Sequence, residues 1–264
     1  MSRLPVFFIP HGGGPCFFME WPAPNPWKKM ELFLAGFIKE LPERPVALVV
    51  ISAHWEESTI GVSTNPAPQL IYDYHNFPAH TYDLTWPAQG DQALAGRIEQ
   101  KLSVDGVSCE LHAERGFDHG VFVPLKVAVP DADIPTVVLS LRSDFDPDFH
   151  LKVGASIECF REEGVLIIAS GMSYHNLQVM GSGVQSSESG AFDAWLTETV
   201  QSEALIRNPQ LRAWRRAPFA RFCHPREEHL VPLFVASGAA GYDVGRCIFT
   251  DHVLGGAVSA YRFG

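Results

Sequence analysis

The sequence predicts a single α/β domain, with a central mixed β-sheet flanked by helices and a metal site at the strand ends. The first observation behind this prediction is that short β-branched apolar runs alternate with segments of helical period along the 264 residues. The second is that several of the apolar runs lead directly into a histidine. Ligands of open α/β sheets bind just beyond the carboxyl ends of the strands, so these histidines are expected in the site.

Composition argues against several classes of function. The chain has 46% hydrophobic and 19% charged residues, which is ordinary for a globular protein. A net charge of -10 argues against nucleic acid or an anionic membrane as a partner. The sequence shows no signal-peptide pattern, and no apolar run approaches the roughly 18 residues of a membrane span. The five cysteines are scattered without a Cys-x-x-Cys pair, so we expect reduced thiols and a cytoplasmic location.

The clearest strand lies within the stretch from Val46 to Glu57 and leads to His54. Its apolar part is short and β-branched, as in a strand buried on both faces, and it stops at small residues before His54. Glu56 and Glu57 follow at once, so a histidine and two carboxylates arrive together at a position where sites concentrate. The alternative is a histidine that only caps the strand and bonds a loop carbonyl.

A first buried strand is predicted over residues 4–9, and it leads into His11 and the glycines 12–14. Glycine allows positive φ and a close backbone approach, so this loop can fold tightly around an ion or a substrate. The Lys and Ser/Thr of a phosphate-binding loop are missing, and no G-x-G-x-x-G follows, which argues against a nucleotide site. A plain glycine turn is the alternative.

The remaining elements follow from hydrophobic period and from start and stop signals. Helices are expected over residues 26–41, 91–102, 146–163, 189–203 and 209–216, and a last one from Pro225 through Leu233. Further strands are expected over residues 60–64, 136–141, 165–170, 244–249 and 257–263. We find no repeat, low-complexity tract or linker, so residues 1–264 are expected to form one catalytic domain.

Residues 66–87 are rich in proline and aromatic side chains and lack a helical or strand period. A segment this long is often a functional loop, and its aromatic tips suit a lid over a planar ligand. A packed surface loop is the alternative.

Four histidines stand out by their positions after predicted strands or at a predicted helix start: His11, His54, His175 and His229. Imidazole suits zinc, iron and copper, and three nitrogen ligands with an open position are typical of a catalytic metal site. The remaining histidines at 80, 112, 150 and 252 lack such contexts and are expected to be exposed or capping.

Six short motifs then occur in a characteristic order. They are His11-Gly-Gly-Gly-Pro, Ser52-Ala-His54-Trp-Glu, Tyr72-Asp-Tyr with Phe77-Pro, Asp118-His119-Gly, His175-Asn-Leu and Glu228-His229-Leu-Val-Pro-Leu. Together the motifs resemble the class III extradiol ring-cleaving dioxygenases, of the DOPA-dioxygenase type related to the LigB subunit of protocatechuate dioxygenase. The resemblance extends from Pro5 to about Gly241.

The resemblance implies a role for each matching residue. His11, His54 and His229 would ligate one non-haem metal ion, with Fe(II) expected for activity and Zn(II) as the other occupant. His175 would be the acid–base group beside the metal, or a fourth ligand, and His119 would contact substrate or bound oxygen. The substrate-binding residues would be Tyr72, Tyr74, His75 and Phe77.

The implied reaction is the cleavage of a small catechol, DOPA-like or other, by O₂ in the catabolism of aromatic compounds, without a flavin or nicotinamide cofactor. LigB-like relatives use a glutamate as the third metal ligand, and Glu227 and Glu228 directly precede His229. His224 is the rival of His229. Five residues along a helix turn through about 140°, so both could not enter one site from one helix; the resemblance favours His229.

Two other functions stay open at this point. Three histidines also describe a zinc-dependent hydrolase, and a non-enzymatic metal-binding interaction protein can share the fold. A serine hydrolase is disfavoured, because Ser173 lacks the G-x-S-x-G elbow. The oligomeric state is not predicted.

Overall fold

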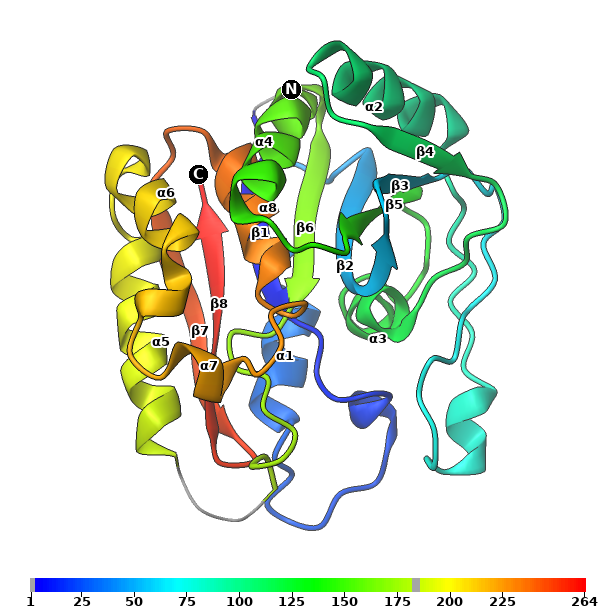
Figure 1. Ribbon diagram of the computed structural model, residues 1–264. Helices are drawn as coiled ribbons and strands as arrows, with labels where there is room; N and C mark the ends of the chain where they lie inside the picture. The colour runs from blue at the N-terminus through cyan, green and yellow to red at the C-terminus, as the bar shows by residue number, and fades with distance from the viewer. Residues whose placement is uncertain (1–2, 182–185) are drawn as a thin grey trace.

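Four parallel strands form the middle of an eight-stranded sheet whose order is β4-β3-β5-β2-β6-β1-β8-β7 (Figure 1). The computed structural model describes residues 3–181 and 186–264. Its strands are β1 (Val6–Pro10), β2 (Ala47–Glu57), β3 (Ile60–Ser63), β4 (Cys109–His112), β5 (Thr136–Arg142), β6 (Val165–Gly171), β7 (Gly245–Val253) and β8 (Gly256–Phe263). The predicted α/β fold with a mixed sheet is confirmed.

The pairing places the carboxyl ends of three neighbouring strands side by side. β2 pairs in parallel with β5 and β6, and β6 pairs in parallel with β1. β8 runs antiparallel to β1 and to β7, and β3 runs antiparallel to β5. Because β1, β2 and β6 point the same way, the residues that follow them lie beside one another.

The eight helices of the described residues cover the sheet. They are α1 (Lys28–Gly36), α2 (Gln92–Val104), α3 (His119–Ala128), α4 (Pro147–Ile157), α5 (Ser187–Val200), α6 (Ala204–Arg212), α7 (Ala220–Cys223) and α8 (Val231–Ala240). Short 3-10 turns form η1 (Cys16–Phe18), η2 (Ala79–Tyr82), η3 (Glu158–Glu163) and η4 (Trp214–Arg216). Aspartates cap the starts of α2 and α4, since the Asp91 and Asp146 carboxylates accept the N–H of Leu94 and Phe149.

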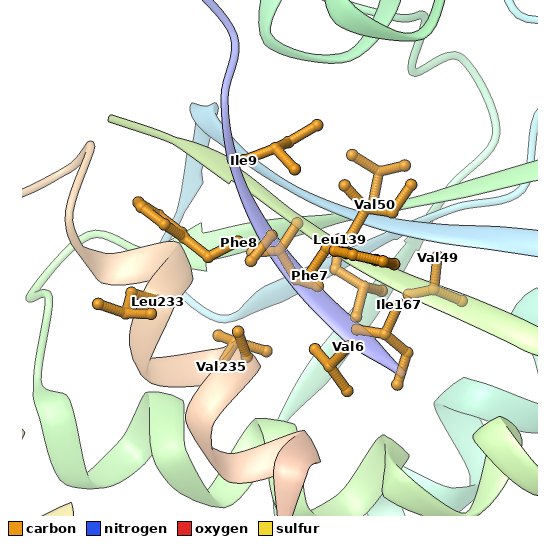
Figure 2. Close-up of a cluster of buried hydrophobic side chains, with 14 of the residues drawn as sticks. Val6, Phe7, Phe8, Ile9, Val49, Val50, Leu139, Ile167, Leu233 and Val235 are labelled. Carbon is orange, nitrogen blue, oxygen red and sulfur yellow. The ribbon is translucent and has the colours of Figure 1, made fainter. Parts of the chain in front are cut away.

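The middle of the sheet is buried on both faces, which explains why its strands are runs of apolar residues instead of alternating ones. Val6, Val49 and Ile167 come from the adjacent strands β1, β2 and β6, and Leu233 and Val235 of α8 belong to the same cluster (Figure 2). Each such side chain contributes about 1.5–3 kcal/mol when buried. The result is a rigid platform under the strand ends.

Several predicted boundaries are wrong. Strand β2 does not stop before His54 but runs on to Glu57, with a register shift against β5 between Ile51 and Glu56. The helix expected over residues 26–41 is limited to α1. The one expected over residues 146–163 ends as α4 at Ile157 and continues as a 3-10 turn.

Two proline signals were also misassigned. Pro209 lies inside α6 and does not start a helix. The last helix does not begin at Pro225: residues 224–230 form turns, and α8 begins at Val231 with Pro232 in its first turn. Among the described residues, no helix combines the length and the apolar character needed to cross a bilayer.

Candidate metal centre

Three histidines from distant parts of the chain meet at the carboxyl ends of the central strands β1, β2 and β6. His11 follows β1, and its N–H donates to the Gly171 carbonyl at the end of β6 (3.2 Å). His229 lies in the turn before α8, and its carbonyl accepts the N–H of Met172 (2.9 Å). With His54 of β2, these residues offer ligand atoms that all lie within 4.8 Å of one another.

The imidazole of His11 is the least satisfied polar group at these strand ends. The residue is 1% exposed, and neither ring nitrogen has a hydrogen-bond partner among the residues that the structure describes. Its ring centroid lies 4.8 Å from that of His54 and 5.1 Å from that of His229. Leaving a buried polar atom unpaired costs about 1–3 kcal/mol, and a bound cation would remove that cost. The residues therefore fit a metal ion.

Burial also keeps these imidazoles neutral. Burial is the largest cause that lowers the pKa of His11 and His229 well below the usual value, and the neighbouring histidines lower it further. Burial is also the main reason why the pKa of His54 is lowered. Neutral imidazole is the form that binds a metal, so the lone pairs are available at neutral pH.

A buried serine and aspartate shape the backbone around His54. The Ser52 hydroxyl donates to Oδ1 of Asp118 (2.7 Å) and accepts the N–H of His54 (3.2 Å). Arg115 pairs with the other carboxylate oxygen (2.5 Å), so the fully buried Asp118 is neutralised. A Cβ atom at Gly120 would lie 2.9 Å from Cδ2 of His54. The start of α3 therefore fixes the position of the His54 ring.

His175 lies against His229 on the side of β6. Its N–H donates to the Cys223 carbonyl (3.0 Å), and its ring stacks on that of His229 with centroids 3.5 Å apart. Oε1 of Glu228 lies 2.8 Å from Nδ1 of His229 and 3.3 Å from Nδ1 of His175. Burial alone would raise the pKa of Glu228, but hydrogen bonds from His175 and from the backbone, together with the charge of Arg226, lower it.

A second carboxylate, that of Asp73, contacts His119 and His54. Oδ1 of Asp73 accepts the backbone N–H of His119, the first residue of α3, and lies 2.9 Å from its Nδ1. Oδ2 of Asp73 lies 3.6 Å from Nδ1 of His54. Neither Asp73 nor Glu228 was predicted as a site residue, although both belong to the six sequence motifs.

The predicted substrate-binding residues lie on the loop that carries Asp73. Tyr74 is buried, donates its hydroxyl to the Thr81 carbonyl (2.6 Å) and has its ring centroid 5.9 Å from that of His119. Tyr72 donates to the Leu84 carbonyl (2.7 Å). Phe77 lies beside Gly14, where a Cβ would approach its ring to 2.8 Å, and His75 is exposed. Their contact with a substrate stays a prediction.

Of the other histidines, His224 lies outside the cluster as expected, whereas His150 differs from the prediction. His224 is fully buried away from the cluster, with Nε2 bonded to the Ser173 carbonyl (3.0 Å), and it ends the short helix α7. His150 was expected to be exposed or capping, but it is fully buried. Both of its ring nitrogens have partners there, since Nδ1 bonds the Asp146 carbonyl (2.7 Å) and Nε2 accepts the N–H of Arg142 (3.1 Å).

Comparison with known proteins agrees with this arrangement. Residues 7–262 match the family described as the catalytic LigB subunit of aromatic ring-opening dioxygenase. The chain is therefore a LigB-like class III extradiol dioxygenase.

Its relatives share most of their length with it. A 4,5-DOPA dioxygenase extradiol of Beta vulgaris is 35% identical over 98% of this chain and 96% of its own. The protein of that name in Escherichia coli K12 is 31% identical over 90% of this chain and 86% of its own. The crystal structure of an uncharacterized protein from Escherichia coli K12 superposes with a TM-score of 0.79 at 26% identity, covering 99% of this chain and all of that one. The LigB-like chain is thus a metal-dependent ring-opening dioxygenase with a histidine-rich site suited to a non-haem metal.

Proposed function

We propose that the chain, as one catalytic domain over residues 1–264, cleaves a small catechol with O₂ at a metal held by His11, His54 and His229. The observation that carries the proposal is the buried imidazole of His11, which has no protein partner among the described residues and faces two other neutral imidazoles. The names of the relatives support a DOPA-like catechol as the first substrate to test. Catabolism of aromatic compounds is the corresponding role.

A divalent metal bound here would offer open positions to both catechol oxygens and to O₂, and it would lower the pKa of the first hydroxyl. Three imidazoles leave such positions free. We propose Fe(II) for turnover, because zinc lacks redox chemistry, although the same nitrogens suit either ion.

His175 would accept the proton of the second hydroxyl. Its Nδ1 faces Glu228 at 3.3 Å, which leaves Nε2 as the basic nitrogen. Its side chain is 20% exposed, so it can exchange that proton with solvent after turnover. Histidine is the side chain that most often transfers a proton in this way.

His119 would contact the substrate or oxygen from the opposite side. Asp73 holds both its backbone and its ring, and the ring centroid lies 3.9 Å from that of His54. The aromatic loop that carries Asp73 would then cover the catechol ring and set substrate choice. Replacing His75 or Phe77 by Ala should change the ranking of catechols by kcat/KM at unchanged metal content. An unchanged ranking would mean that the segment is only a packed surface loop.

The function is tested by loading the metal-free protein with Fe(II) under anaerobic conditions and then adding O₂ with a panel of catechols that includes DOPA. We expect oxygen uptake equal to the catechol consumed, and no uptake with the zinc-loaded protein. A zinc hydrolase or a non-enzymatic binding protein would consume no oxygen with any catechol.

A further inference from the structure

A single carboxylate oxygen contacts two histidines of the centre. Oε1 of Glu228 lies 2.8 Å from Nδ1 of His229 and 3.3 Å from Nδ1 of His175. The two rings are nearly parallel, at 19°, with centroids 3.5 Å apart. The two rings therefore contact each other through their faces and share one acceptor oxygen at their Nδ1 edges.

The Oε1 atom of Glu228 lies on the side of His229 away from the ion that this ring would bind. Nε2 of His229 is the nitrogen that faces Nε2 of His54, at 3.2 Å. Nδ1 and Nε2 point away from opposite edges of an imidazole ring, so an oxygen bonded to Nδ1 lies behind the ring as seen from the ion. Glu228 therefore acts on the ion through His229.

A cation lies near the carboxylate of Glu228. The side chain is 11% exposed, and its second oxygen lies 3.7 Å from Nη1 of Arg226. Arg226 in turn pairs with Glu56, two residues beyond His54 on β2, at 2.7 and 2.5 Å. This row of charges connects the turn before α8 to the end of β2 and places a cation beside Glu228.

We propose that Glu228 is a positioning residue that fixes the tautomer and orientation of His229 and His175 together. By accepting from Nδ1–H of both rings, it leaves Nε2 of each as the free lone pair. One carboxylate would thereby prepare a metal ligand and the base beside it. The proposal rests on the assignment of His229 as a ligand in the proposed function.

Three variants test the role. Glu228→Ala removes the acceptor, and Glu228→Gln keeps an acceptor oxygen without the charge. Glu227→Gln is the matched control: the adjacent carboxylate is equally buried but pairs with Arg215 and Arg221 (2.5 Å to the latter), away from the histidines. Metal affinity is measured for each by competition with a chelator, and each is then assayed at saturating metal.

We expect Glu228→Ala to weaken metal affinity by about 10–100-fold, the usual effect of losing a partner of a ligand histidine. Glu228→Gln should lie between Glu228→Ala and the parent protein, and all three variants should still bind one ion at saturation. Glu227→Gln should bind the metal as the parent does, even if it unfolds at a lower temperature. Loss of stability alone therefore does not reproduce the expected pattern.

A second readout observes the histidines directly. In the zinc-loaded protein labelled with ¹⁵N-histidine, NMR should show His229 and His175 as Nδ1–H tautomers, and Glu228→Ala should shift at least His175 to a mixture. Parent-like affinity and tautomers in Glu228→Ala would overturn the proposal. So would complete loss of the ion in Glu228→Gln at saturating metal, which would make Glu228 a ligand. Retention of the ion in His229→Ala would instead refute the proposed metal centre.

Discussion

His54 and His229 face each other with their Nε2 atoms 3.2 Å apart. Because Nδ1 of His229 is bonded to Glu228, its proton lies there and its Nε2 carries a lone pair. Two ligand nitrogens of a four-coordinate zinc or iron ion lie about 3.3 Å apart at bond lengths near 2.0–2.1 Å. The separation is therefore the one that a shared ion requires. Such an ion would connect the end of β2 to the turn before α8.

The first prediction concerns the ligands. His11→Ala, His54→Ala and His229→Ala should each abolish stoichiometric metal binding, because two imidazoles and solvent hold an ion weakly. His224→Ala is the control, since that ring bonds the Ser173 carbonyl away from the cluster. Elemental analysis of the four purified proteins decides the matter. Loss of metal in the His224 variant with retention in the His229 variant would reverse the assignment.

The second prediction separates base from ligand at His175. His175→Gln should keep its metal and bind catechol, while turnover falls by about 10²–10⁴, the usual contribution of a positioned base. The deficit should shrink as pH rises, because hydroxide then replaces the missing group. A fourth ligand would behave differently: metal affinity would fall together with the rate, and no pH would restore activity. Metal content and a pH–rate profile on one preparation distinguish the two.

The third prediction concerns the close approach of α3 to β2. Gly120→Ala places a Cβ 2.9 Å from Cδ2 of His54 and 3.0 Å from Oγ of Ser52, so the ring must move. We expect metal affinity to fall by about 10-fold or more, as it does when the support of a ligand is disturbed. Gly96→Ala on α2 is the control, because a Cβ there meets nothing within 4 Å among the described residues. It should leave metal affinity unchanged and add about 0.5–1 kcal/mol of stability. Equal metal affinities in the two variants would contradict the packing argument.

The fourth prediction concerns acid stability and a histidine outside the site. Burial lowers the pKa of His150 from 6.5 to about 4. The unfolded chain therefore takes up a proton near pH 6.5 while the folded one does not, so stability falls as pH decreases from 6.5 to 4. His150 should account for about 3 kcal/mol of that loss. His150→Asn should be less stable at neutral pH but show a shallower pH dependence in denaturant titrations; an unchanged slope would mean that His150 ionises normally.

Much of the site follows from local sequence. His11 and His175 come directly after buried strands, and parallel strands bring such residues together without any knowledge of distant contacts. The extension of β2 through His54 was not predictable, because it depends on the shifted pairing of Glu56 with Leu141 of β5. Long-range pairing of this kind leaves no periodic signal in the strand itself.

The helix that begins at His119 was missed for a similar reason. Gly120 and Pro124 are poor helix formers, and the N–H of His119 is satisfied by Asp73 from another loop. At Pro225 a helix start was predicted where none exists. Pro225 and Pro232 both fit a helix start, and only packing selects the second. Glu228 was not predictable as a shared acceptor, since His175 reaches it only in the folded chain.

The most direct test of the central claim is the fate of the two oxygen atoms. The iron-loaded protein should be given one equivalent of a catechol that it consumes under ¹⁸O₂, and the product reduced at once to prevent exchange with water. We expect a ring-opened product that carries two ¹⁸O atoms per molecule, and no such product from the His11→Ala variant. A quinone with labelled hydrogen peroxide, or a product without ¹⁸O, would contradict the central claim.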